Sequence, residues 1–123
     1  MTSEVHSLAD HQQIPRAERI ARLNDALRKS GQGGVIVVTR GVRALPGFDA
    51  EALLTMLLVT NGFDSDNDPY GERDFGDLEW NDGTDLLWKI DYYCSRDMTF
   101  ASPDPADPAV TQRVLTVMLA SEY

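Results

Sequence analysis

The sequence predicts an α+β fold, with a mainly antiparallel four-stranded sheet, three helices and the order α-β-α-β-β-β-α. Two observations favour this class. Apolar residues recur at helical spacing in three segments, two in the first half of the chain and one at its end. Between residues 75 and 100, apolar and polar residues alternate in short runs separated by turn-forming residues. Strands that follow one another in a block, with helices outside it, are typical of α+β proteins.

A chain of 123 residues is long enough for one domain with a modest core. Residues 1–13 are polar and aperiodic, so we expect a flexible N-terminal tail. Residues 14–123 are expected to form the single domain. No segment repeats.

The first half of the chain predicts helix, strand and helix. The first helix opens at Pro15, with Ile20, Leu23 and Leu27 on one face, and ends at Gly31. Arg16, Arg19, Arg22 and Arg28 lie mostly off that face. The segment GVIVVTR (34–40) contains the β-branched run VIVV, which predicts a strand buried on both faces.

Residues 41–47 then form a connection to the second helix. Asp49 is expected to cap that helix, and Phe48 and Leu53 have the spacing of a hydrophobic staple. The segment is strongly apolar and ends at Asn61–Gly62.

The second half predicts three strands and a helix. Gly76 suggests a bulge in the first strand, which ends at a hairpin turn over residues 81–83. In the second strand the predicted inward positions are Leu86, Trp88, Ile90 and Tyr92. Residues 98–100 complete a short third strand. The last helix is expected to begin at Asp107–Pro108, with an apolar stripe formed by Val110, Val114, Val117 and Met118.

The charge is uneven along the chain. The net charge is -9, and residues 61–107 carry thirteen acids against three bases. Such an excess disfavours direct binding to nucleic acid and anionic membranes and favours basic partners. Two interpretations remain open at this point: a solvated sheet face, or a negatively charged docking surface.

The N-terminal residues lack the basic and apolar regions of a signal peptide, and no apolar run approaches the length of a membrane helix. A single cysteine, Cys94, allows no intramolecular disulfide. We therefore expect a cytoplasmic protein.

Several segments resemble a small bacterial family of unknown function. They are IARLND (20–25), VTRGV (38–42), NDPYGERDFG (67–76), WKIDYY (88–93) and the C-terminal segment that begins with SPDPADP (102–108). The resemblance covers about residues 18–123. Such proteins are common in alphaproteobacteria and often lie on mobile elements. The resemblance implies no activity, but its setting favours anti-defence or plasmid-maintenance roles.

A cation site is the first chemical candidate. Asp64, Asp66 and Asp68 match the first, third and fifth ligand positions of an EF-hand loop, but Pro69 and Phe75 stand where that loop needs glycine and glutamate. A looser site for a hard cation, formed by Asp64, Asp66, Asp68 and Glu72, remains an alternative.

Other catalytic sites have weaker support. The only histidines, His6 and His11, lie in the predicted tail, which disfavours zinc and leaves Cys94 without a base. Cys94 is expected to be a half-buried residue at a strand end. Catalysis by a carboxylate pair such as Asp74 and Glu79 stays open.

The leading hypothesis is a non-enzymatic acidic protein that docks on a basic protein surface. On a mobile element, the target would be a defence system that handles nucleic acid, and the protein would act as an anti-CRISPR or anti-restriction inhibitor by nucleic-acid mimicry or steric block. No cofactor is expected. The predicted partner-binding residues are Asp64, Asp66, Asp68, Tyr70, Glu72, Asp74, Asp77, Glu79, Asp82, Asp85 and Tyr93.

Two other hypotheses remain. The first is a small divalent-cation-dependent enzyme with a carboxylate site at residues 64–74. The second is a homo-oligomer in which the arginine-rich first helix meets the acidic face of a neighbour.

Overall fold

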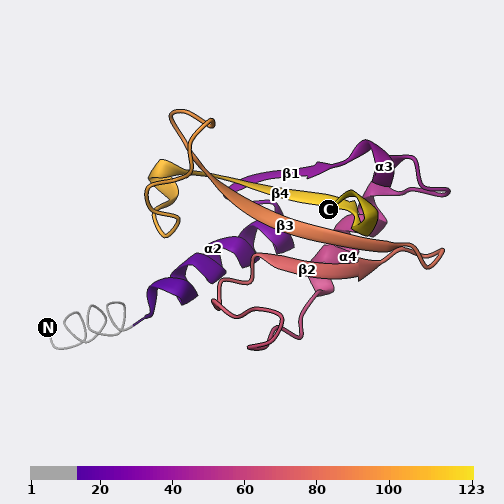
Figure 1. The fold of residues 1–123 in the computed structure, drawn as a ribbon, viewed down its shortest axis with the longest axis horizontal. Helices are drawn as coiled ribbons and strands as arrows, with labels where there is room; N and C mark the ends of the chain where they lie inside the picture. The colour runs from indigo at the N-terminus through magenta and orange to yellow at the C-terminus, as the bar shows by residue number, and fades with distance from the viewer. Residues whose placement is uncertain (1–13) are drawn as a thin grey trace, which may run out of the picture.

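The computed structural model describes residues 14–123, and the predicted tail, residues 1–13, lies outside them. The elements in chain order are α2 (Arg16–Ser30), β1 (Gly34–Val38), α3 (Arg40–Arg43), α4 (Ala50–Val59), β2 (Phe75–Glu79), β3 (Asp85–Cys94), η1 (Pro108–Val110), β4 (Thr111–Leu119) and η2 (Ala120–Glu122). The strands form one sheet in the order β1-β4-β3-β2, and α2 and α4 pack behind it in the view of Figure 1.

The sheet is mixed. β1 runs parallel to β4, whereas β4 and β3, and β3 and β2, are antiparallel neighbours. The α+β class is confirmed for residues 14–123, and the numbers of α-helices and strands, three and four, are as predicted, although not every one is the segment expected. The sheet is not purely antiparallel, and the expected element order is partly wrong.

The predicted C-terminal helix is a strand. Pro108 begins only the short turn η1, capped by the Asp107 side chain, and β4 follows from Thr111. Its residues are buried in alternation, as a strand with one covered face requires. Val114 and Val117, predicted to share a helical stripe, therefore lie on opposite faces of the sheet. The β-branched residues of this segment favour a strand once it has neighbours on both sides.

The predicted third strand at residues 98–100 is absent. Met98 and Phe100 are 49% and 67% exposed, and the Asp97 side chain accepts hydrogen bonds from the N–H and hydroxyl of Thr99. These bonds close a turn, and an isolated β-bridge next to it joins Tyr93 to Ala101. The segment forms a loop between β3 and β4.

β1 is an edge strand and is not buried on both faces as predicted. Ile36 and Val38 pack against the core, but Val35 and Val37 are 47% and 42% exposed. The connection after β1 also contains an unpredicted short helix, α3, which begins after Thr39. The Thr39 side chain accepts a hydrogen bond from the N–H of Val42 and so caps α3.

Several local predictions are confirmed. Gly31 ends α2 in the left-handed conformation, and the Asp49 side chain caps α4 at the N–H of Glu51. Residues 81–83 form the turn between β2 and β3. The predicted bulge at Gly76 is wrong, because Gly76 pairs with Trp88 in an unbroken register.

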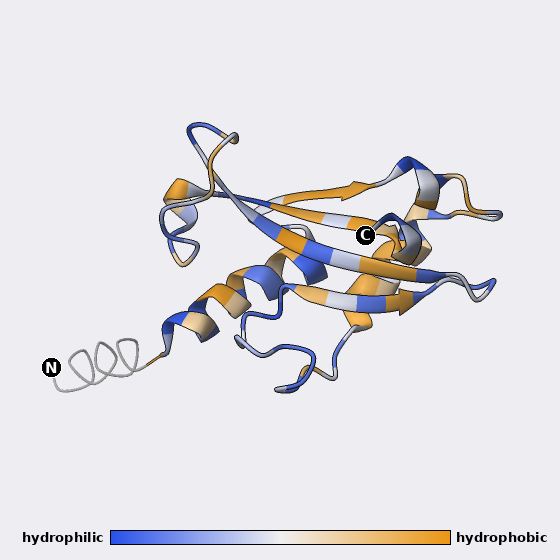
Figure 2. Cartoon of the chain, viewed as in Figure 1, coloured by the Kyte–Doolittle hydropathy of each residue, from blue (hydrophilic) through white to orange (hydrophobic). Residues whose placement is uncertain are grey.

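The core lies between the sheet and the two long helices. It contains buried residues from β3 and β4 and from both helices, namely Leu27, Leu53, Leu57, Leu86, Trp88, Ile90, Leu115 and Val117. The other side of the sheet, here called the open face, carries no α-helix from the described part of the chain. Figure 2 shows that apolar colour dominates β1, while the loop before β2 is mostly hydrophilic.

Candidate docking surface

Three of the predicted partner-binding acids build turns. Asp64 accepts hydrogen bonds from the N–H groups of Asp66 and Asn67, at 2.9 and 3.0 Å. Asp68 accepts from the N–H of Arg73, and Asp82 accepts from that of Thr84, each at 3.0 Å. Their carboxylates are used within the chain, in the manner of short polar residues in turns.

Glu72 and Asp74 face inward. Glu72 accepts a hydrogen bond of 2.8 Å from the hydroxyl of Tyr92, a half-buried residue of β3. Asp74 is half-buried, and burial, followed by repulsion from Glu72 and Asp68, raises the pKa of its carboxyl. Both side chains are therefore less accessible to a partner than those of the exposed acids.

The remaining predicted acids are exposed. Asp77 and Glu79 lie on β2 and Asp85 begins β3, where Asp85 pairs with Glu79 across the hairpin. None of the three side chains makes a hydrogen bond or ion pair with another residue of the 14–123 segment. The alternation of the strand places all three on the open face. We call Asp77, Glu79 and Asp85 the hairpin acidic surface.

A hollow of about 390 Å³ adjoins this surface at the β2 edge. Asp66, from the loop before β2, and Asp77 line it, with Phe63 and Phe75 as its apolar side chains. Asp66 is exposed, so it can act together with the hairpin acidic surface. Its neighbours in the loop, Asp64 and Asp68, are less available, because one oxygen of each carboxylate already accepts the hydrogen bonds of a turn.

The two predicted tyrosines differ in exposure. Tyr70 is 83% exposed at the tip of the loop before β2. Tyr93 is half-buried on the open face of β3, opposite Gln112 of β4. Tyr70 is therefore the aromatic side chain that a partner can reach most easily.

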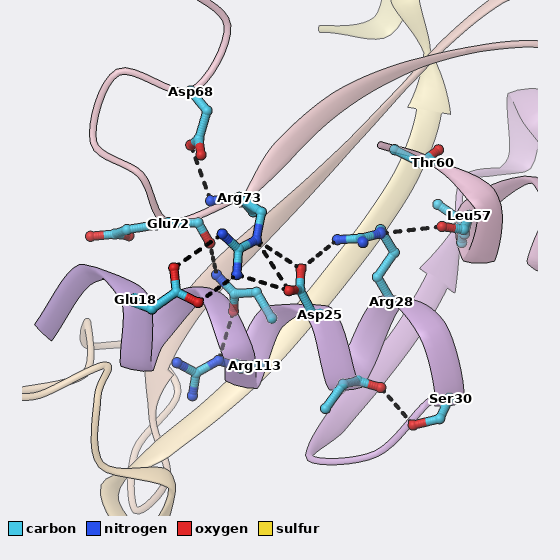
Figure 3. Close-up of polar contacts among 12 residues, drawn as sticks. Glu18, Asp25, Arg28, Ser30, Leu57, Thr60, Asp68, Glu72, Arg73 and Arg113 are labelled. Carbon is cyan, nitrogen blue, oxygen red and sulfur yellow. Dashed lines mark hydrogen bonds and ion pairs between the residues drawn. The ribbon is translucent and has the colours of Figure 1, made fainter. Parts of the chain in front are cut away.

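The loop that carries these acids is tied to α2 by Arg73, which sequence reasoning did not single out. Figure 3 shows its guanidinium between Glu18 and Asp25, with nitrogen–oxygen distances of 2.9 to 3.2 Å. Arg28, 3% exposed in α2, binds the other side of Asp25 at 3.0 Å. We call Glu18, Asp25, Arg28 and Arg73 the Arg73 clasp.

The clasp shifts the ionisation of its carboxylates. The hydrogen bond from Arg73 lowers the pKa of Glu18. Burial raises the pKa of Asp25, but hydrogen bonds from Arg73 and Arg28 outweigh burial, and the net pKa lies below its usual value. Both carboxylates thus contribute stability that is present above their ordinary pKa values of 4.5 and 3.8 and is lost at lower pH.

We expect Arg73→Met to lower the free energy of unfolding by about 1–2 kcal/mol at pH 7, since the clasp is only partly buried. The difference from wild type should shrink as the pH falls toward about 3, because the unfolded chain then binds protons at carboxyls whose pKa values the clasp lowers. Urea unfolding at the two pH values measures it. Arg96→Met, which removes one exposed arginine from a turn, is the matched control. An equal loss for both variants would contradict the assignment.

A second polar network lies beneath the clasp and was also missed. Arg113 of β4 is 1% exposed; its Nε donates to Asn24 Oδ1 at 2.8 Å, and its Nη2 donates to the carbonyl of Pro105. Its guanidinium lies 5.2 Å from the centre of the Tyr92 ring. Asn24 in turn donates to the Tyr92 hydroxyl and to the carbonyl of Glu72. This network joins α2, β3, β4 and the acidic loop.

The structure bears on the catalytic alternatives as well. Within residues 14–123, no group of three or more His, Cys, Asp and Glu side chains is placed to hold a metal ion. The Glu72 carboxylate, proposed to act with Asp64, Asp66 and Asp68, accepts a hydrogen bond from the hydroxyl of Tyr92 instead. Cys94 is half-buried at the end of β3, as predicted, and the histidines His6 and His11 lie outside the described residues.

The fold and this surface define a small α+β protein with helices on one side of a mixed sheet and an acidic hairpin at one edge. The chain belongs to the family described as "Protein of unknown function (DUF3768)", whose model matches residues 38–122. This confirms the expected membership of a family of unknown function. No curated protein and no solved structure matches the chain. None of the helices in residues 14–123 could span a membrane.

Proposed function

We propose that the chain is a non-enzymatic acidic protein that docks on a basic protein surface. Its target would be a groove for nucleic acid in a bacterial defence complex, of the CRISPR or restriction type. Carboxylates would stand in for phosphates there and exclude the nucleic acid. The proposal includes a cytoplasmic setting and needs no cofactor.

The observation that supports the proposal best is the hairpin acidic surface. Asp77, Glu79 and Asp85 are fixed on paired strands, and their carboxylates are free of internal partners among the described residues. The backbone that carries these charges is already ordered, so binding costs little backbone conformational entropy. The charges also steer a basic partner at long range and make association sensitive to salt.

A simpler explanation competes with docking. Charged residues on an edge strand discourage pairing with another sheet, and Asp77 and Glu79 lie on the edge strand β2. That role needs charges of either sign, whereas docking on a basic surface needs negative ones. Charge reversal therefore separates the two explanations.

We expect Asp77→Lys/Glu79→Lys to reduce capture of a basic protein from bacterial lysate at least about tenfold relative to wild type. Wild-type capture should also fall between about 0.05 M and 0.3 M salt, because screening weakens the attraction. Mass spectrometry identifies the captured protein, and a nucleic-acid binding assay with that protein tests whether the wild-type chain blocks it.

A second variant changes the net charge equally but leaves the hairpin acidic surface intact. Glu51→Lys/Thr55→Lys/Gln32→Lys alters exposed positions outside β2 and β3. It should bind the partner nearly as well as wild type. If both variants capture the same proteins, or if the captured protein still binds nucleic acid normally, the docking proposal fails and edge protection remains.

A further inference from the structure

β1 offers an open edge of main chain. It forms one end of the sheet, and no described strand lies on its outer side. The N–H of Thr39 donates to the carbonyl of Val117 in β4 at 3.0 Å. Because these groups alternate along a strand, the N–H and C=O of Gly34, Ile36 and Val38 point away from β4. The outward groups are therefore free to pair with another strand.

The two edges of the sheet differ in chemistry. β2 carries Asp77 and Glu79, the kind of charged residues that protect an edge. β1 contains no charged residue and is drawn mostly in the apolar colour in Figure 2. Val35 and Val37 are 47% and 42% exposed on the open face. An uncharged edge of β-branched residues is a template for strand addition.

We propose that β1 pairs antiparallel with β1 of a second copy of this chain, about a two-fold axis at Ile36. The segment Val35-Ile36-Val37 reads the same in both directions around Ile36, so an identical strand is its natural complement. Gly34 would face Val38 of the second copy, and Ile36 would face its own counterpart. These pairs all use outward-pointing groups, and they supply about six main-chain hydrogen bonds.

The charge distribution allows this partner when the two copies meet at β1. Two chains of net charge -9 repel each other unless their acids stay apart. Pairing through β1 places the two hairpin acidic surfaces at opposite ends of the joined sheet, since β2 is the other edge. The arginine-rich α2 does not supply an alternative contact as readily, because Arg16, Arg22 and Arg28 already bind acids of the same chain.

Apolar surface beside β1 enlarges the contact. A hollow of about 320 Å³ lies between β1 and α4, lined by apolar side chains that include Ile36, Val38 and Leu54. Leu54, in the first half of α4, is 46% exposed. In an antiparallel pair of β1 strands both copies keep their helices on the same side of the joined sheet, so the N-terminal halves of the two α4 helices would lie near the junction. Burial of Leu54 would add to the main-chain hydrogen bonds.

Sedimentation equilibrium of the full chain tests the proposal. Wild type should have twice the mass of one chain, and Val37→Lys should raise the dissociation constant of the dimer at least about tenfold. Tyr70→Lys makes a change of equal charge in the loop before β2, and it should leave the mass unchanged. Added salt should strengthen the dimer by screening like charges, the reverse of its effect on acidic docking.

Amide hydrogen exchange supplies a second measurement. In the dimer the outward amides of Gly34, Ile36 and Val38 should be protected to the level of Val35 and Val37, and Val37→Lys should expose the outward set alone. Circular dichroism of that variant checks that it folds. A monomeric wild type overturns the proposal, even with a protected Ile36 amide, because the chain would then cover its own edge. A dimer that Val37→Lys leaves intact also overturns it.

Discussion

Replacing Arg113 by alanine is expected to lower the free energy of unfolding by about 3–5 kcal/mol, a larger loss than we expect for Arg73→Met. The side chain is 1% exposed and binds Asn24 and the carbonyl of Pro105. Its removal leaves these two acceptors without their donor and opens a cavity beside Tyr92. Urea unfolding, monitored by tryptophan fluorescence, measures this loss of stability.

The physical reason lies in the surroundings of the guanidinium. Burial lowers the pKa of Arg113, and no ion pair in residues 14–123 includes it. Its charge is compensated by neutral oxygens and by the face of the Tyr92 ring. Arg113→Met should lower the free energy of unfolding less than Arg113→Ala does, because methionine keeps the packing of the aliphatic part of the arginine side chain. A loss below about 1 kcal/mol for alanine would show that the network does not stabilise the fold.

Gly76→Ala is expected to destabilise the protein by about 2–3 kcal/mol. A Cβ atom at this position would lie 2.5 Å from Trp88 Nε1 and 2.7 Å from Cε2 of the same ring. Trp88 is fully buried in the core, so the indole cannot move aside without disturbing its neighbours. Thermal unfolding and the emission of Trp88 report the change.

The expected loss of stability is opposite in sign to the usual effect of replacing glycine by alanine in a strand. Alanine normally stabilises a strand relative to glycine, by roughly 0.5–1 kcal/mol. Asp77→Ala, at the next and exposed position of β2, should change stability by less than about 0.5 kcal/mol. A neutral or stabilising Gly76→Ala would mean that the Trp88 ring does not pack across Gly76 as described.

Local signals predicted much of the fold. Gly31, Asp49 and the turn at residues 81–83 act through their own backbone or side chains, so their roles were visible in the sequence. β4 was not recognised because a buried arginine interrupts its apolar alternation. With Arg113 on the covered face, the spacing of Val110, Val114, Val117 and Met118 imitates a helical stripe.

The sequence predicted which part of the chain is acidic, but not which of its carboxylates are free to bind a partner. The acids of the loop before β2 are evident in the sequence. Which of them are free for a partner is decided by the hydrogen bonds that Asp64 and Asp68 accept within turns. Arg73 and its partner Glu18 are 55 residues apart, and no spacing rule connects them. Arg28 was expected off the apolar face of α2, and it is buried because the carbonyl of Leu57 and the carboxylate of Asp25 bind it.

The position of β4 also governs when the fold can form. β4 lies between β1 and β3, although it is the last of the four strands in the chain. Gly34 in β1 finds its partner only at Arg113. During synthesis, at roughly 5–20 residues per second, β1 therefore leaves the ribosome several seconds before β4. Its four β-branched residues stay unpaired for that time. Because this pairing joins strands far apart in the chain, we expect folding to be slow relative to that of helical proteins of this size.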